Sequence, residues 1–432
     1  TVSSSTNQSY ESSLSASLSG DGIIVEYGTG SIRYVIDSFT TGSPDDFSNF
    51  TTSSLNSKFE TTTGTRVYQQ PLYLEDIGKI AFSSGSSSNT SNLYYVTSSS
   101  PGTSNPELIN SSAFPFYYAA AISGSHYIGS PGGYLYFYNG GTTGTAIASG
   151  YYNLAYDSSN NRLWAGNQTN GWGNWDINTG SLSSSNQSFS SLSGISSPIG
   201  IISDSTNNIM HMVQITTALS TADGGWVHNI SSISSSATNI AAGDQTNSKS
   251  ALQDNDLFMG NIGPTYGFGN TFITLDSNRD KLYIYSPGYS GSPSSKDARI
   301  AGFDIPTRTW SSLATTSGYA TSSLKFGSGN NLPYFGNIVY SPIHDVVVVG
   351  AAGDKIIVYD AGDFSTPIQT LSDVFLGSTT LNNNTGEIIF WDGASGDLSV
   401  LTPNSAASPV FRYAVSKYNG DPDITLTPGL GN

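Results

Sequence analysis

Histidine and cysteine are the residue types that most often hold a metal ion or attack a substrate, and this sequence has few of them. The four histidines, His126, His211, His228 and His344, are far apart, and no pair has the spacing that brings two imidazoles to one ion. The chain has no cysteine, which excludes disulfides, thiolate metal sites and cysteine nucleophiles. We expect packing and surface histidines, with no catalytic residue, no metal and no cofactor.

Acidic residues recur at one position of a repeated pattern. Asp157, Asp204 and Asp276 each open a short polar stretch between two apolar runs. Such residues cap tight turns by accepting backbone N–H bonds, whereas a calcium loop needs several carboxylates at alternating positions. Each stretch holds only one or two, so we expect caps. Pairing of acids for glycoside hydrolysis depends on the fold, and with 31 Asp and Glu it stays open.

Other chemistries lack their sequence signals. There is no Gly-x-Ser-x-Gly elbow and no phosphate-binding loop. The net charge is −16 and the 15 Lys and Arg are scattered, so no basic stripe could neutralise a phosphate backbone and we expect no nucleic-acid partner. No apolar run is long enough to predict a membrane span.

Aromatic residues give the best hint of a ligand. Tyr152, Trp164, Trp172 and Trp175 lie close in sequence, and asparagines stand between them. Aromatic faces with amide neighbours suit the stacking of a sugar ring and recognition of its hydroxyls. The alternative is that these large side chains fill space between packed sheets. We name these four residues as candidates for glycan stacking.

Sequons for N-glycosylation are numerous in this Ser-, Thr- and Asn-rich chain. They permit a glycosylated surface, although such a composition produces many sequons by chance. Asn89 and Asn383 are expected to be the most accessible. The candidates are Asn7, Asn49, Asn89, Asn110, Asn167, Asn186, Asn229 and Asn383.

The elements that position these residues form a repeat. An apolar run, a six-residue polar turn and a second apolar run occur at 152–166, 199–213 and 272–285, with weaker copies centred on 341–346 and 382–387. Tyr, Thr, Val and Ile favour strands, and hairpins that cannot bury both faces alone must stack on their neighbours. The repeat predicts an all-β fold, a β-propeller.

Seven repeat units fit residues 77–415, with insertions near 231–269 and 287–296. Residues 1–76 are expected to be an extension whose strands either close the ring or add an eighth blade; we favour seven blades, because an open ring would leave unpaired strand edges. Residues 416–432 are expected to be a C-terminal tail.

Several units end in an aromatic residue followed by Asp, as in Tyr359-Asp360. The fullest form is Phe303-Asp304-Ile-Pro-Thr307-Arg-Thr-Trp310, and Gly132-Gly133 precedes another unit. The chain resembles kelch-type and YVTN-type repeat proteins of the extracellular kind, most closely in the Asp-x-x-Thr-x-x-Trp ending. The resemblance implies a β-propeller.

The leading functional hypothesis is a non-enzymatic β-propeller on the outside of a cell or on a virion. It would act in adhesion, in a coat or in a filament, by binding glycans or surface proteins. The low-charge surface and a chain that begins at Thr1 indicate a processed, exported protein. The alternative is a secreted glycan-active hydrolase or lyase with carboxylates in the propeller channel. Residues 13–19 alternate like a strand that could join a neighbour's sheet edge, which predicts self-association.

Overall fold

The computed structural model describes the strands and most of the tight turns of the chain. Within the terminal strands, up to residue 41 and after residue 410, the description covers the backbone. The described residues are 14–19, 22–27, 32–41, 50–54, 70–84, 91–98, 105–113, 118–123, 126–130, 134–149, 151–167, 171–178, 181–187, 195–216, 227–236, 246–249, 273–286, 298–316, 337–351, 355–374, 376–392, 398–404 and 411–417.

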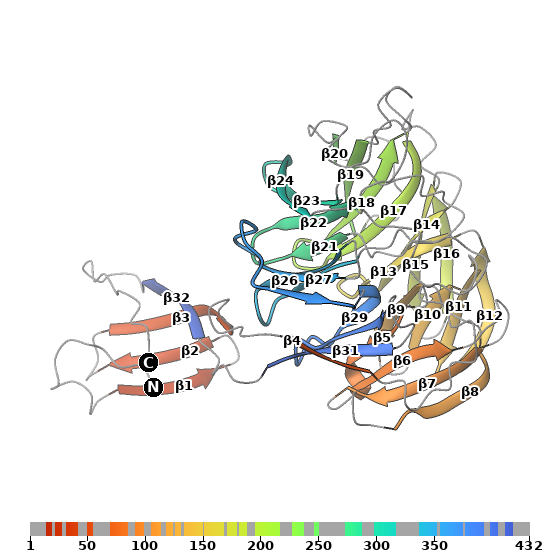
Figure 1. Ribbon diagram of the computed structural model, residues 1–432, viewed down its shortest axis with the longest axis horizontal. Helices are drawn as coiled ribbons and strands as arrows, with labels where there is room; N and C mark the ends of the chain where they lie inside the picture. The colour runs from red at the N-terminus through yellow and green to blue at the C-terminus, as the bar shows by residue number, and fades with distance from the viewer. Residues whose placement is uncertain are drawn as a thin grey trace. The chain divides into compact units, whose positions relative to one another are not determined.

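Four-stranded antiparallel sheets are the repeating element, and seven of them form a β-propeller (Figure 1). Blade 1 contains β5 (Leu72–Leu74), β6 (Lys79–Ser84), β7 (Ser91–Thr97) and β8 (Glu107–Ala113). Blade 2 contains β9 (Tyr118–Ser123), β10 (His126–Ser130), β11 (Tyr134–Asn139) and β12 (Thr142–Ser149). Blade 3 contains β13 (Tyr151–Asp157), β14 (Arg162–Asn167), β15 (Gly171–Asn178) and β16 (Ser181–Gln187).

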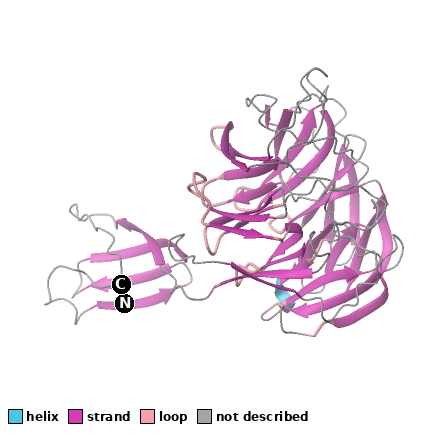
Figure 2. Cartoon of the chain, viewed as in Figure 1, coloured by secondary structure: helices cyan, strands magenta, loops and turns pink. Residues whose placement is uncertain are grey.

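The next blades repeat this order. Blade 4 contains β17 (Ile195–Asp204), β18 (Ile209–Thr216), β19 (Val227–Ser234) and β20 (Thr246–Lys249). Blade 5 contains β21 (Ile273–Asp276), β22 (Lys281–Ser286), β23 (Ala298–Asp304) and β24 (Thr309–Thr316). Blade 6 contains β25 (Ile338–Ser341), β26 (Val346–Ala351), β27 (Lys355–Asp360) and β28 (Gln369–Ser372). The described helix is one short 3-10 turn, η4 (Glu75–Ile77), as Figure 2 shows.

Blade 7 closes the ring with a strand from the other end of the propeller sequence. It contains β29 (Leu376–Leu381), β30 (Ile388–Asp392), β31 (Leu398–Pro403) and, as its fourth strand, β4 (Phe50–Ser54). Gln369 of blade 6 also holds β4: its Oε1 accepts from the Phe50 N–H at 2.7 Å, and its Nε2 donates to the Phe50 carbonyl at 3.0 Å. The all-β, seven-bladed prediction is confirmed. Of the two expected roles of the N-terminal strands, β4 takes the first and closes the ring.

The remaining strands form a separate four-stranded sheet, which we call the terminal sheet. Its order is β1 (Leu14–Ser19), β2 (Gly22–Tyr27), β3 (Ile32–Thr41) and β32 (Phe411–Lys417). The chain divides into two compact units: Thr1–Ser48 with Ile343–Asp345 and Asn404–Asn432, and Asn49–Pro342 with Val346–Pro403. The terminal sheet belongs to the first unit and the propeller to the second.

These bounds differ from those expected from the sequence. Position 77, the expected start of the propeller, falls after β4 and β5, and position 415, the expected end, falls within β32 of the terminal sheet. The stretch 231–269, expected to be an insertion, includes the end of β19 and all of β20. The expected tail, 416–432, begins inside β32, and its remainder lies outside the described residues, as does 287–296.

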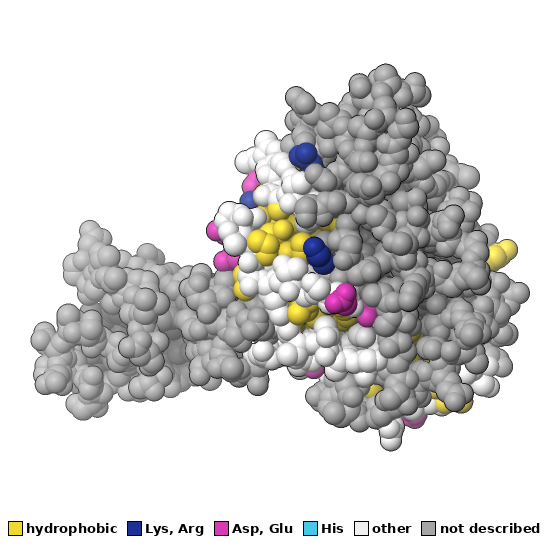
Figure 3. All heavy atoms as spheres, viewed as in Figure 1, with side chains coloured by type: hydrophobic (Ala, Val, Ile, Leu, Met, Phe, Trp, Pro, Cys, Tyr) yellow, Lys and Arg dark blue, Asp and Glu magenta, His cyan; other side chains and the backbone are white. Residues whose placement is uncertain are grey.

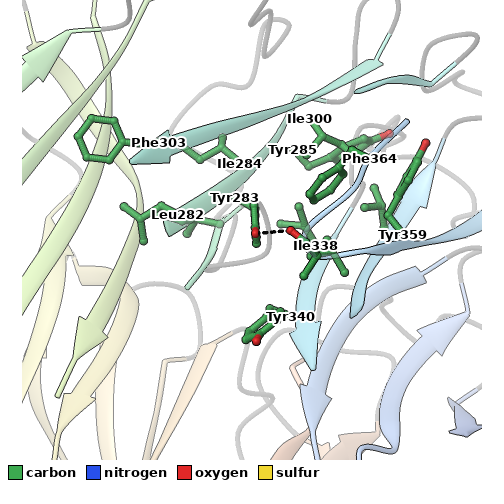
Figure 4. Close-up of a cluster of buried hydrophobic side chains, with 14 of the residues drawn as sticks. Leu282, Tyr283, Ile284, Tyr285, Ile300, Phe303, Ile338, Tyr340, Tyr359 and Phe364 are labelled. Atoms are coloured by element: carbon green, nitrogen blue, oxygen red, sulfur yellow. Dashed lines mark hydrogen bonds between the residues drawn. The ribbon is translucent and has the colours of Figure 1, made fainter. Parts of the chain in front are cut away.

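The hydrophobic core lies between neighbouring blades. The second strand of a blade is covered on both faces, which explains its continuous apolar sequence: every residue of β30 is buried, and so is Val346–Val349 of β26. One core cluster joins blades 4, 5 and 6, and Figure 4 shows its central residues. Phe364 of blade 6 lies 5.2 Å from the ring of Tyr283 in blade 5 and 5.4 Å from Tyr359. The fourth strands are outermost, and β28 alternates between half-buried and exposed residues.

Candidate functional site: the hairpin-turn face

The repeated six-residue turns lie on one face of the ring. In blades 3 to 7 they join the first strand to the second. First strands of neighbouring blades contact one another around the ring centre. The fifth residue of each described turn has a left-handed backbone: φ is 52° at Asn161, 55° at Asn208, 49° at Asp280 and 53° at Asp345. Asn and Asp tolerate this conformation best after glycine. We call this surface the turn face.

The first-position acids are caps, as the sequence predicted. Asp157 accepts from the Ser159 N–H at 3.0 Å and Asp204 accepts from the Asn207 N–H at 3.0 Å. The side chains of Asp157 and Asp204 are buried. Their oxygens are therefore occupied by the protein's own donors.

Asp276 is the most completely bonded of these acids. Its Oδ1 accepts from the N–H groups of Asn278 and Arg279, at 3.0 and 3.1 Å. Its Oδ2 lies 2.9 Å from Arg279 Nη1 and 2.9 Å from the Tyr283 hydroxyl. That hydroxyl is also 2.8 Å from the carbonyl of Ala361 in blade 6. Burial, followed by the negative charge of Asp276, raises the pKa of Tyr283 far above its ordinary value.

Asparagines at the third or fourth turn position tie the turns of blades 3, 4, 5 and 7 to the next blade. Asn160 Nδ2 donates to Ser235 of blade 4 at 2.9 Å, and Asn207 Nδ2 lies 3.4 Å from Asp280 of blade 5. In the same way Asn278 donates to the Tyr340 hydroxyl of blade 6, and Asn384 donates to the Tyr73 hydroxyl of blade 1. The turn face is thus cross-linked around much of the ring, which makes it rigid.

A buried polar chain joins blades 4 and 5. His211 is fully buried; its Nδ1 lies 2.9 Å from Ser232 Oγ and its Nε2 lies 3.8 Å from Asp204 Oδ2. Arg308, from the last turn of blade 5, donates to Ser232 Oγ at 3.0 Å and to the Ile230 carbonyl at 3.2 Å. Burial alone would raise the pKa of Asp204, but the nearby His211 imidazole and the hydrogen bonds from Asn207 outweigh it and lower that pKa.

This Asp, His and Ser arrangement resembles a hydrolase triad only in composition. Ser232 is 8% exposed and His211 is 0% exposed, so a substrate has no access to the hydroxyl. Arg308 donates to the same oxygen, and burial lowers the pKa of the Arg308 guanidinium. The chain is a structural tie between two blades, and its members were not singled out from the sequence.

The candidate glycan-stacking residues do not form a surface platform. Trp164 and Trp175 are 0% and 1% exposed and belong to core clusters between blades. A sugar cannot reach these two rings, so the prediction that they stack on a glycan is wrong. They fill the space between sheets, as the alternative interpretation proposed. Trp172 lies on β15 and Tyr152 on β13, and their side chains lie outside the description.

The sequons fall at different kinds of position. Asn383 is exposed in the turn of blade 7, whereas Asn110 is half-buried on β8 and its Nδ2 donates to the Gly141 carbonyl at 3.3 Å. Asn167, Asn186 and Asn229 lie on the strands β14, β16 and β19, without described side chains. The others lie outside the described residues: Asn7, Asn49 and Asn89.

The histidines and acids do not gather into a metal centre within the described part of the chain. There, no group of three or more His, Asp or Glu is arranged to hold an ion. His126 and His344 are half-buried, and His228 lies on β19. No helix in the described ranges is long and apolar enough to cross a bilayer.

The described surface is mostly uncharged. On the face that Figure 3 draws, most of the described surface is backbone and side chains that are neither charged nor hydrophobic, around a hydrophobic patch and a few acidic and basic groups. On the turn face Ser158, Ser205, Thr206, Ser277 and Thr385 are all exposed. What this face can offer a ligand is a fixed array of hydroxyl and amide groups.

Comparison with known proteins supports the fold. The chain matches no protein-family model and no curated protein sequence. Among solved structures it is similar to the WD40 domain of Pan2 from Neurospora crassa, with a TM-score of 0.51 and 9% sequence identity, over 83% of this chain and 97% of that one. The larger unit is therefore a seven-bladed β-propeller of the general WD40 shape. The kelch-type and YVTN-type resemblance stays a prediction.

Proposed function

We propose that the chain is a non-enzymatic binding protein of an extracellular, cell or virion surface, acting in adhesion, a coat or a filament. The observation that carries the proposal is the use of acids on the first strands. Among the described residues of those strands, the carboxylates are Asp157, Asp204 and Asp276. Each of them accepts hydrogen bonds from N–H groups of its own turn. Hydrolysis of a glycan needs two carboxyl groups free to reach the same bond.

The rigidity of the turn face supports a binding role. A preorganised surface loses little conformational entropy on association, so polar contacts contribute more to affinity. Asparagines such as Asn160 and Asn278 fix the turns to the neighbouring blades. The exposed hydroxyls between them are then held at constant spacing.

A protein is the better supported of the two proposed partners. The glycan hypothesis depended on open aromatic rings, and Trp164 and Trp175 are buried. A glycan would have to be recognised by hydroxyl and amide groups alone. The fold favours protein partners because propellers present a broad, flat face of turns.

The alternative function is a secreted glycan-active hydrolase or lyase. It requires acids on loops of the ring other than the described turns. A screen of polysaccharide substrates with the full chain tests it directly: reducing ends or unsaturated sugars released by the wild-type protein would establish this alternative and overturn the binding proposal.

Self-association through residues 13–19 is part of the proposal. Among the described strands, β1 lies at an edge of the terminal sheet and pairs with β2. Its other edge supports the addition of a strand from a neighbouring molecule. Truncation of residues 1–20 should then abolish assembly and leave the propeller folded.

The binding proposal is tested by paired charge variants. The full chain is assayed against a glycan array and a panel of recombinant cell-surface ectodomains. We expect saturable binding to a protein, weakened at least tenfold by the double variant Ser205→Arg/Thr206→Arg on the turn face. The control is Thr52→Arg/Ser53→Arg on the exposed strand β4. Equal weakening by both variants, or no binding to either panel, would refute the turn face as the binding surface.

A further inference from the structure

The terminal sheet has one continuous apolar face, defined by its register. Directly paired residues share a face of a sheet, and alternate residues of a strand share a face. Val25 of β2 pairs with Ala16 of β1 and with Tyr34 of β3. Beyond them, Ile36 pairs with Val415 of β32. The apolar residues at positions of this face are Leu14, Ala16, Leu18, Ile23, Val25, Tyr27, Ile32, Tyr34, Ile36, Phe39, Phe411, Tyr413 and Val415.

The opposite face has a different composition. Ser17 pairs with Ile24, and Glu26 pairs with Arg33. Ser15, Ser19, Ser38, Thr40, Arg412 and Ser416 occupy further positions of it. The apolar positions of this face are Ile24, Val35, which pairs with Ile24, and Ala414. Hydroxyl and charged residues occupy most of its other positions, so this face is suited to water. The sheet is therefore strongly two-sided across all four strands.

A two-sided sheet needs a second layer over its apolar face. Stable β folds bury that face against another sheet or a helix. Among the described residues of its unit there is one sheet, β1-β2-β3-β32, and no helix. The described residues of this unit therefore supply no second layer.

We propose that a second copy of this chain supplies that layer, so that two terminal sheets pack face to face as a β-sandwich. The inference rests on the self-association proposed above. It replaces strand addition at the edge of β1 with packing of one whole sheet face against another. A two-fold contact covers the apolar faces of both copies at once. Among the paired residues of the described strands, the charged residue on this face is Lys417, at the end of β32. Two copies can therefore meet without like charges of paired residues facing each other at the centre.

The size of the face suits a dimer. Strands of six residues, at about 3.3 Å per residue and about 4.8 Å between strands, give four strands a face of roughly 400 Å² in projection. Two such faces give roughly 800 Å² when flat. Side-chain relief raises the buried accessible area toward about 1,200 Å², where stable interfaces begin.

Two adjacent residues of β2 provide a matched test. Val25 occupies the apolar face and Ile24 the polar face, and both are β-branched residues of an inner strand. The full chain is studied by sedimentation equilibrium over a wide concentration range. We expect the wild type to dimerise, Val25→Lys to weaken dimerisation by about 100-fold or more because two buried ammonium groups would meet, and Ile24→Lys to dimerise like the wild type.

Hydrogen exchange at residues 22–27 and 411–417 checks that the sheet of each variant is folded. If Val25→Lys loses protection there, Ala16→Lys on β1 replaces it, with Ser17→Lys as its control. A wild-type monomer at all concentrations would overturn both self-association and the face-to-face mode. A wild-type dimer that both variants retain, or that both lose with the sheet still protected, would overturn the face-to-face mode while leaving self-association in place.

Discussion

The buried cap Asp276 should contribute more to stability than any exposed cap of the same kind. Asp276→Ala removes the acceptor for the N–H groups of Asn278 and Arg279, the ionic partner of the Arg279 guanidinium, and one partner of the Tyr283 hydroxyl. Asp276 is 0% exposed, so its oxygens bond to the protein and not to water. The substitution removes the acceptor of three partly buried N–H donors, while the Tyr283 hydroxyl keeps the Ala361 carbonyl.

The size of the effect follows from these contacts. A lost hydrogen bond costs about 1 kcal/mol, and a bond to a charged group costs about 1.5–3 kcal/mol. The Arg279 side chain is 30% exposed, so solvent screening reduces the contribution of its ion pair with Asp276 to stability. We expect Asp276→Ala to lower the free energy of unfolding of the propeller by about 3–5 kcal/mol. Asp304 caps an exposed turn through the Thr307 N–H at 2.8 Å, and Asp304→Ala should cost about 0.5–1 kcal/mol.

Urea unfolding followed by tryptophan fluorescence measures this difference. Every tryptophan of the chain lies between 164 and 391, within the unit that forms the propeller, so the signal reports on that unit. Tryptophan emission and far-UV circular dichroism should move together if blades 5 and 6 unfold with the ring. An Asp276→Ala variant that loses no more stability than Asp304→Ala would refute the reasoning that burial makes this cap costly to remove.

Three further predictions concern other parts of the ring. Gln369→Leu removes both bonds to the Phe50 backbone; hydrogen exchange at 50–54 should quicken about tenfold, as expected for about 1–2 kcal/mol. The lowered pKa of Asp204 stabilises the fold above the ordinary carboxyl pKa, and this stability is lost as the pH falls through the folded value; thermal unfolding from pH 7 to 2 should show a smaller acid-induced loss in Asp204→Asn. In a host that N-glycosylates, peptide mass spectrometry should find a glycan on Asn383 and none on Asn110.

Each of these has an outcome that contradicts it. Unchanged exchange in β4 for Gln369→Leu, or equal quickening in the exposed-site variant Thr370→Leu, would mean that Gln369 does not hold the closing strand. If acid lowers the unfolding temperature of Asp204→Asn as much as that of the wild type, other carboxyl groups determine the loss of stability at low pH. A glycan on Asn110 would show that this side chain is modified before its bond to the Gly141 carbonyl forms.

Local features of the fold could be predicted from the sequence. The turns at Asp157, Asp204 and Asp276 depend on neighbouring residues, since the acid caps the turn and Asn or Asp adopts the left-handed position. The same is true of the weaker copy that begins at Asn382, where Gly386 takes that position with φ of 73°. Repetition of this hairpin was enough to predict a seven-bladed ring.

Contacts between distant residues could not be predicted in the same way. Gln369 and Phe50 are 319 positions apart, and Arg308 and Ser232 are 76 apart, so no local pattern connects them. The burial of Trp164 depends on residues such as Met210 and Met212 of the neighbouring blade, which lie in the same core cluster. β32 was missed as a partner of β3 because that pairing joins the two ends of the chain.

The path of the chain at blade 7 has a mechanical consequence. β3 and β32 are hydrogen-bonded neighbours in the terminal sheet, and the strands that follow and precede them, β4 and β31, are hydrogen-bonded neighbours in blade 7. A pull exerted on the terminal sheet is therefore divided between two adjacent strands of a single blade. The hydrogen bonds between β4 and β31 are therefore the first in the propeller to bear that load.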